Sequence, residues 1–193
     1  WHAPTSMAAM RAGKNVFCEK PMSLTVHEGR VMADAVAHYG CVFQIGTPNR
    51  SRRVFLRLSE LVRNGRIGKV HTIRLNLFRA YSEYEIEYRP DSTPQPVPKG
   101  FNYDMWLGQA PEAPYVPGRC HFFFRYLYDY AGGNVTDFGA HYLDVVQWAN
   151  DTEHTGPISV DGRGVFPRDG LYDAATDWQI DYEYASGVKL LFK

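Results

Sequence analysis

The sequence contains little cysteine and no long apolar run. Only three cysteines occur among its 193 residues, Cys18, Cys41 and Cys120, and they are too scattered for a disulfide framework or a metal cluster. We therefore expect no metal site, and we expect Cys18 and Cys41, which lie in apolar segments, to be buried thiols. The absence of any run of about 18 apolar residues excludes a transmembrane helix, so we expect no membrane partner.

The chain also has no excess of either charge. Lysine and arginine number 21, as do aspartate and glutamate, so no overall field attracts nucleic acid or an anionic membrane. A small polar ligand is the easier partner. Hydrophobic residues make up 45% of the sequence, enough for the core of one domain or parts of two. The first residues lack a signal-peptide pattern. The sequence begins with Trp1 and not with Met, however, and we expect it to start inside a domain, so both cytoplasmic and exported locations stay open.

The first 50 residues alternate helical and strand-like segments. The pattern predicts a helix over 1–12, a strand over 15–18, a helix over 25–40 and a strand over 41–45. Thr25 and Glu28 have the spacing of a capping box at the start of the second helix, and Gly40 ends it. Short links between such segments are typical of βαβ units in a parallel sheet, where ligands bind outside the carboxyl ends of the strands.

Polar residues occur at the ends of both predicted strands. Glu19 and Lys20 directly follow the first strand, and Asn49 and Arg50 come shortly after the second. We therefore expect these side chains to border the ligand crevice of the sheet.

The remainder of the chain is rich in strands. The sequence predicts a helix over 52–64, a half-buried strand over 70–80, one or two helical turns over 101–107, and strands over 158–165, 176–184 and 188–192. The apolar face of the helix over 52–64 is expected to contain Val54, Leu58, Leu61 and Val62. Prolines 90, 94, 96 and 98 mark an irregular segment. We expect an α/β domain over 1–50, followed by a mostly antiparallel α+β sheet domain over 51–193 that is incomplete at its end.

A predicted helix from Gly132 to Asn150 has two kinds of face. One stripe is apolar and comprises Val135, Phe138, Tyr142, Val145 and Ala149, whereas a neighbouring face holds Asp137, His141, Asp144 and Trp148. Asp137 and His141 are four positions apart, and a carboxylate beside an imidazole fixes its tautomer and raises its basicity. The same pair also occurs on ordinary solvated helix faces, so the spacing alone leaves both interpretations open.

Two motifs together are more specific. The run Gly13-Lys-Asn-Val-Phe-Cys-Glu-Lys-Pro-Met-Ser23 resembles the Glu-Lys-Pro segment of the glucose-fructose oxidoreductase and inositol dehydrogenase (Gfo/Idh/MocA) family. Gly132-Gly133 followed by Asp137-x-Gly139-x-His141-x-x-Asp144 is similar to the catalytic helix of that family. Because both motifs occur in the family order and in the expected strand-end and helix contexts, the resemblance spans essentially the whole chain.

The resemblance implies that residues 1–50 are the carboxyl-terminal part of a Rossmann-type domain that binds NAD or NADP. The glycine-rich fingerprint that holds the cofactor pyrophosphate in this family is absent from the sequence, as is the acidic residue that recognises the adenosine ribose. We therefore expect the chain to be a fragment, with tight cofactor binding restricted to the intact protein.

The resemblance also implies three catalytic residues. His141 is the general base, Lys20 stabilises the developing alkoxide and positions the nicotinamide ribose, and Asp137 orients His141 or shares in proton transfer. Without the family context, a lysine before a proline in a loop is more often solvated than functional.

Other residues are candidates for cofactor or substrate contacts. Cofactor contacts are assigned to Glu19, Lys20, Pro21, Thr47, Asn49 and His2, and substrate contacts to Arg50, Trp106, Arg125 and Asp144. The arginines offer planar forks of donors, and Trp106 either packs against a sugar ring or fills a gap between a loop and the sheet. Asp144 either holds a sugar hydroxyl or supports the neighbouring polar residues.

These features favour a dehydrogenase that acts on a sugar, a cyclitol or a derivative. An enzyme that recycles bound NAD while cleaving a glycoside needs the same residues, and a non-catalytic sugar-binding or dimerisation module is a further alternative. The resemblance also implies a homo-oligomer that associates through the open face of the sheet.

Overall fold

The computed structural model describes residues 1–77 and 92–193, which form two compact units. Among the described residues, the first unit comprises 1–46, 92–137 and 168–174, and the second comprises 47–77, 138–167 and 175–193. None of the helices in the described ranges is long and apolar enough to cross a membrane.

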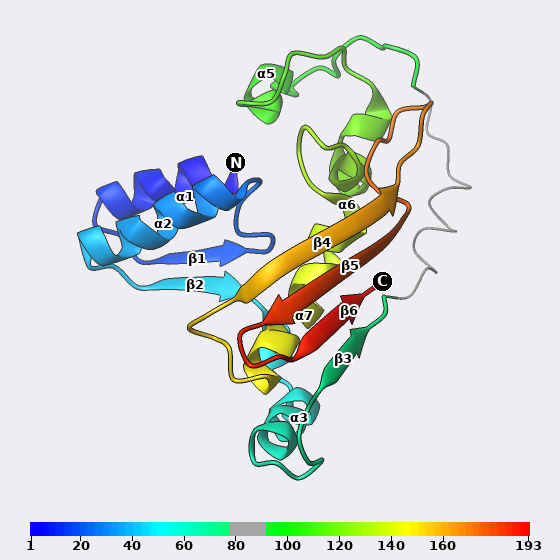
Figure 1. The fold of residues 1–193 in the computed structure, drawn as a ribbon. Coiled ribbons are helices and arrows are strands. Elements are labelled where there is room, and N and C mark those ends of the chain that lie inside the picture. Colours follow the sequence, from blue (N-terminus) through cyan, green and yellow to red (C-terminus); the bar gives the residue numbers. More distant parts are fainter. Residues whose placement is uncertain (78–91) are drawn as a thin grey trace. The chain divides into compact units, whose positions relative to one another are not determined.

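The first unit begins with two helices and two parallel strands (Figure 1). The elements are α1 (His2–Arg11), β1 (Val16–Glu19), α2 (Val26–Tyr39) and β2 (Phe43–Gly46). β1 pairs with β2 in parallel, from Val16 opposite Phe43 to Glu19 opposite Gly46. A small apolar core between the helices contains Met10 and Met32, which are both fully buried. The predicted alternation of helix and parallel strand is thus confirmed.

The start and end of α2 follow the sequence prediction. The Thr25 hydroxyl accepts a hydrogen bond from the backbone amide of Glu28 at 3.1 Å, and the Glu28 carboxylate accepts one from the amide of Thr25 at 3.3 Å. This reciprocal capping box satisfies amides that have no partner inside the helix. Gly40 ends the helix with a left-handed backbone, φ 60°, which glycine adopts without steric cost.

The rest of the first unit consists of short helical pieces and an aromatic cluster. These pieces are α5 (Tyr103–Leu107), η2 (Pro117–Arg119), η3 (His121–Tyr126) and α6 (Gly133–Thr136). Tyr103 stacks on Trp106 at 5.8 Å between ring centroids, and Tyr130 meets the Trp106 ring edge-on at 5.0 Å. The single turn of α5 agrees with the prediction of one or two turns.

The second unit contains a four-stranded sheet in the order β3-β6-β5-β4. The strands are β3 (Thr72–Leu75), β4 (Pro157–Val165), β5 (Asp177–Tyr184) and β6 (Lys189–Phe192). β5 is antiparallel to both of its neighbours, whereas β3 and β6 are parallel. The mostly antiparallel α+β sheet predicted from the sequence is confirmed.

Two helices and a short 3-10 turn complete the second unit: η1 (Pro48–Ser51), α3 (Arg53–Arg63) and α7 (Phe138–Ala149). The core between α7 and the sheet contains Val146, Tyr184, Val188 and Leu190, with Leu143 packed against it. On its other side α7 contacts α3, where the rings of Phe55 and Tyr142 meet edge-on at 6.3 Å. The helix therefore has two packing faces, and the single predicted stripe missed the one with Leu143 and Val146.

Three local predictions need correction or qualification. The helix predicted from Gly132 to Asn150 is interrupted at Asp137, whose backbone (φ −82°, ψ −87°) is not helical. In α3 the predicted apolar face is wrong for Val54 and Leu58, which are 68% and 45% exposed, because Ser59, on another face of the helix, is the buried residue. The predicted strand over 70–80 is shorter, and its residues 78–80, like Pro90, lie outside the described ranges.

Candidate active site

The ammonium of Lys20 and the guanidinium of Arg125 both bind the carboxylate of Asp137. Lys20 directly follows β1, Arg125 lies in η3, and Asp137 follows α6. Lys20 Nζ donates to Asp137 Oδ1, and Arg125 Nη1 donates to Oδ2. Asp137 is only 7% exposed. The structure thus brings together one predicted catalytic lysine, one predicted catalytic carboxylate and one predicted substrate contact.

The charges in this cluster affect one another. Burial lowers the pKa of Lys20, the nearby Arg125 guanidinium lowers it further, and the Glu19 carboxylate opposes the change. A buried carboxylate needs charged or hydrogen-bonded partners, and Asp137 has two cations. Removing either cation would leave Asp137 less compensated, so the three groups act as one electrostatic unit.

Arg125 is held in place from two sides. Its Nε donates to the carbonyl oxygen of Phe122 at 2.9 Å, and its guanidinium carbon lies 4.0 Å from the centroid of the Phe122 ring. A guanidinium with a fixed stacking partner has a fixed fork direction. The aromatic side chain of Phe122 therefore orients Arg125 toward Asp137.

The end of β1 also carries the candidates for cofactor contacts. Glu19 is exposed, and its backbone pairs with Gly46. A Cβ at position 46 would come within 2.7 Å of Glu19 Oε2, so glycine leaves room for this carboxylate. His2 Nδ1 lies 2.7 Å from the Pro21 carbonyl oxygen, and since a carbonyl can only accept, Nδ1 carries the proton.

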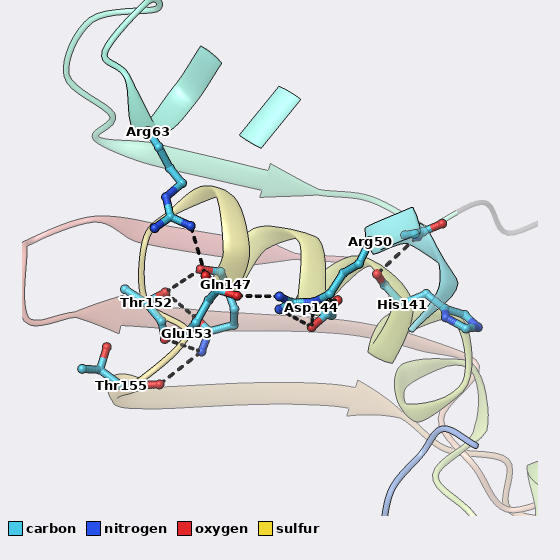
Figure 2. A network of polar contacts seen from close by, with 9 residues as sticks. Arg50, Arg63, His141, Asp144, Gln147, Thr152, Glu153 and Thr155 are labelled. Carbon is cyan, nitrogen blue, oxygen red and sulfur yellow. Dashed lines mark hydrogen bonds and ion pairs between the residues drawn. The ribbon is translucent and has the colours of Figure 1, made fainter. Parts of the chain in front are cut away.

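In the second unit, η1 contacts the turn of α7 that contains His141 (Figure 2). Asn49, 6% exposed, donates from Nδ2 to the carbonyl oxygen of His141 at 3.3 Å. Thr47 precedes η1 and makes no capping hydrogen bond with its side chain. The predicted cofactor contact Asn49 is thus placed beside the backbone of the predicted base.

Arg50 and Asp144, both predicted to contact substrate, bind each other. Arg50 Nε lies 3.0 and 2.8 Å from the two oxygens of Asp144, and Nη2 lies 2.7 Å from Oδ1. Arg50 Nη1 donates to Glu153 at 2.5 Å, and the guanidinium lies 5.4 Å from the centroid of the Trp148 ring. The hydrogen bond from Arg50 lowers the pKa of Glu153.

The sequence did not indicate three members of this network, Glu153, Arg63 and Asp151. Glu153 follows α7 and accepts hydrogen bonds from Arg50 and, at 3.0 Å, from Arg63 at the end of α3; Arg63 also pairs with Asp151. No periodicity marks a carboxylate in a loop, so only its charge and its position after the helix offered a signal.

The described residues hold no group of three or more histidine, cysteine, aspartate or glutamate side chains placed to bind a metal ion. Trp106 lies within the aromatic cluster described above, half-buried, which favours the packing alternative. Its contact with a sugar stays a prediction.

Comparison with known proteins assigns both parts of the chain to one family. Residues 1–47 match the NAD-binding Rossmann fold of the Gfo/Idh/MocA oxidoreductase family, and residues 55–193 match its C-terminal alpha/beta domain. Among curated relatives, myo-inositol 2-dehydrogenase of Thermotoga maritima is 36% identical over 74 residues, covering 38% of this chain and 22% of the relative. Oxidoreductase P35 of Formosa agariphila is 26% identical over 127 residues, covering 63% of this chain and 37% of the relative.

Solved structures share the fold over nearly the whole chain. An oxidoreductase domain protein from Kribbella flavida has a TM-score of 0.67 and 27% identity, with 99% of this chain and 44% of that chain covered. The WlbA dehydrogenase from Bordetella pertussis, in complex with NADH and UDP-GlcNAcA, has a TM-score of 0.67 at 16% identity, with 99% and 47% covered. The chain thus spans less than half the length of these relatives. The C-terminal domain of the family matches residues 55–193 and its NAD-binding domain matches residues 1–47. The chain therefore belongs to the Gfo/Idh/MocA oxidoreductase family.

Proposed function

We propose that the whole protein containing this chain transfers a hydride between a nicotinamide cofactor and a hydroxyl-bearing carbon of a sugar, cyclitol or derivative. The observation that carries the proposal is the cluster that the half-buried Lys20 and Arg125 form around the buried Asp137, in a chain of an oxidoreductase family. Relatives bear the names myo-inositol 2-dehydrogenase, 1,5-anhydro-D-fructose reductase and levoglucosan dehydrogenase. All three names refer to polyhydroxylated rings.

The residues present fit one end of NAD or NADP. Glu19 offers an exposed carboxylate, which can accept hydrogen bonds from ribose hydroxyls, and Gly46 leaves space for it. Lys20 and Pro21 continue the same strand end, and His2 is hydrogen-bonded to Pro21. Thr47 and Asn49 follow β2 in the sequence and are proposed to border the nicotinamide. When bound, the cofactor accepts or returns the hydride.

Residues of this chain transfer the proton and stabilise the developing charge. In the oxidation direction His141 takes the proton of the substrate hydroxyl. The carbon that bears this hydroxyl gives up a hydride, so that a carbonyl group forms. The Lys20 ammonium stabilises negative charge on the reacting oxygen, and Asp137 holds that ammonium in place. In the reverse direction His141 returns the proton to the oxygen.

We propose a division of the chain into domains 1–50 and 51–193, which is supported by the family matches over residues 1–47 and 55–193. The compact units divide the chain differently, since residues 92–137 and 168–174 belong to the same unit as 1–46. We also propose substrate contacts for Trp106 and Arg125. The aromatic ring of Trp106 and the guanidinium of Arg125 suit a sugar, because one covers apolar ring faces and the other donates to hydroxyls. Arg125 has donors besides the one bound to Asp137, so both contacts are compatible.

We also propose a homo-oligomer through the sheet face that is not covered by α7. Alternate residues of β4 and β5 place polar side chains on this face, including the opposed Asp161 and Asp181 and the hydrogen-bonded Arg163 and Gln179. A polar face of this kind suits a hydrated, self-complementary contact. Sedimentation of the whole protein tests it: Arg163→Glu should shift the protein toward monomer.

Turnover assays test the catalytic proposal. The whole protein, supplied with NAD⁺ or NADP⁺ and a panel of inositols, aldoses and glycosides, should form reduced nicotinamide with at least one polyol. Lys20→Met should lower the rate by about 10²-fold or more, because it removes the charge at the reacting oxygen. The exposed Lys14→Met is the matched control and should retain activity. Glycoside cleavage without net cofactor reduction would instead favour the recycling enzyme, and binding without any turnover would contradict the proposal.

A further inference from the structure

Two adjacent residues of η1 contact the turn of α7 that contains His141 (Figure 2). Asn49 donates to the His141 carbonyl oxygen at 3.3 Å, and Arg50 binds Asp144 through two of its nitrogens at 2.7–3.0 Å. Positions 141 and 144 are three apart and thus lie on one side of the helix. The two contacts therefore hold this side of the helix at His141 and at Asp144.

The bond to Asp144 restricts the position of the helix more than a point charge would. Arg50 presents a planar fork to the carboxylate, which fixes direction as well as distance. The second arm, from Nη1 to Glu153 at 2.5 Å, and the Trp148 ring at 5.4 Å hold the guanidinium in its plane. Arg63 then binds the other oxygen of Glu153 at 3.0 Å, so this second carboxylate is itself fixed.

We propose that Arg50 is a positioning residue that fixes, through Asp144, the turn of α7 that carries His141, and that Arg50 does not bind the substrate. The proposal rests on the proposed function of His141 as the base. Proton transfer is sensitive to placement, since an error of about 1 Å can cost on the order of 10²-fold in rate. An arginine committed to two carboxylates has few donors left for a sugar.

Substitution of Arg50 by lysine distinguishes the effect of the two-nitrogen contact with Asp144 from the effect of the positive charge. In the whole protein, Arg50→Lys keeps the positive charge but cannot bind Asp144 through two nitrogens, so kcat should fall about tenfold or more. KM should change less than about threefold, because no substrate contact is lost. Arg57→Lys is the matched control: Arg57 forms an ion pair with Glu60 at 3.4 Å, one turn further along α3, and neither residue belongs to the network around Arg50. It should leave both constants near those of the parent protein.

A double-mutant cycle gives an independent check. Asp144→Asn should reproduce the loss of kcat, and the double variant Arg50→Lys/Asp144→Asn should be no worse than either single variant, because both disrupt one contact. A rise in KM at constant kcat, or losses that multiply in the double variant, would show separate substrate contacts and overturn the proposal. An effect no larger than that of Arg57→Lys would also overturn it.

A spectroscopic measurement separates this proposal from the proposed function. With histidine labelled with ¹³C in the ring and its signal assigned by His141→Gln, the His141 resonance of the substrate-free protein should shift in Arg50→Lys and not in Arg57→Lys. This result would support the positioning contact even if no polyol were turned over. An unchanged resonance in Arg50→Lys would contradict the positioning contact even if the protein proved to be a dehydrogenase.

Discussion

Lys20 and Asp137 are 117 positions apart in the chain, and their charged groups form an ion pair. The pair joins the end of β1 to the end of α6 within one compact unit. Arg125 binds the second oxygen of the same carboxylate. Asp137 therefore determines where the ammonium of Lys20 lies, and the lysine is in turn the charge that we propose to stabilise the reacting oxygen.

Arg125 should influence the ionisation of Lys20. Because the Arg125 guanidinium lowers the pKa of Lys20, Arg125→Gln should raise this pKa. The pH at which Lys20 is half-acylated by an amine reagent, followed by mass spectrometry, should move to a higher value, whereas the exposed Lys14 should show no change. An unchanged or lower half-reaction pH at Lys20 would contradict the assigned cause.

The same shift has a consequence for stability. A lysine with a folded pKa below its unfolded pKa binds fewer protons in the folded state, so the free energy of unfolding rises with pH between the two values. Arg125→Gln should bring the folded pKa of Lys20 closer to its unfolded pKa, and so should reduce the rise of the free energy of unfolding with pH. Urea titrations at several alkaline pH values measure it, and a steeper rise in the variant would count against the assignment.

Gly46→Ala should weaken cofactor binding more than it lowers the stability of the fold. The added methyl group would meet Glu19 Oε2 at 2.7 Å, and the exposed Glu19 side chain can rotate away at a cost of less than about 1 kcal/mol. Rotation withdraws the carboxylate from the proposed ribose contact, so the Kd for the cofactor should rise severalfold in the whole protein, as measured by calorimetry. Gly156→Ala, with no atom within 4 Å of the new methyl group, is the control. Equal binding by the two variants would remove Glu19 from the cofactor site.

Thr25→Ala should destabilise the first unit. The substitution removes the acceptor of the Glu28 amide, and loss of such a cap costs about 1 kcal/mol. Urea unfolding should show this decrease, while Thr25→Ser, which keeps the hydroxyl, should lie close to the parent protein. A loss of equal size in Thr25→Ser would point to packing rather than to the cap.

The sequence predicted features that depend on neighbouring residues. The cap at Thr25, the turn at Gly40 and the alternation in β3 all arise from contacts within a few positions or from a period of two. The two family motifs predicted which residues of the chain belong to the candidate site. These signals were sufficient for the fold class and for Lys20, Asp137 and His141 as candidates.

Pairings between distant residues could not be predicted in this way. Arg50 and Asp144 are 94 positions apart, and each alone looked like a donor or acceptor for a sugar. Nothing in their local sequence shows that they bind each other. The break at Asp137 is similar, because the apolar period runs through it, while the carboxylate is turned toward Lys20 and Arg125.

The most direct test of the account follows a hydride. The whole protein is given a polyol that carries deuterium on its hydroxyl-bearing carbons, with oxidised cofactor, and the reduced nicotinamide is analysed by mass spectrometry. We predict that one deuterium appears in the nicotinamide with the parent protein and with Lys14→Met, and that transfer is nearly abolished in Lys20→Met. Turnover of the polyol with its deuterium released to water, or undiminished transfer in Lys20→Met, would contradict the account.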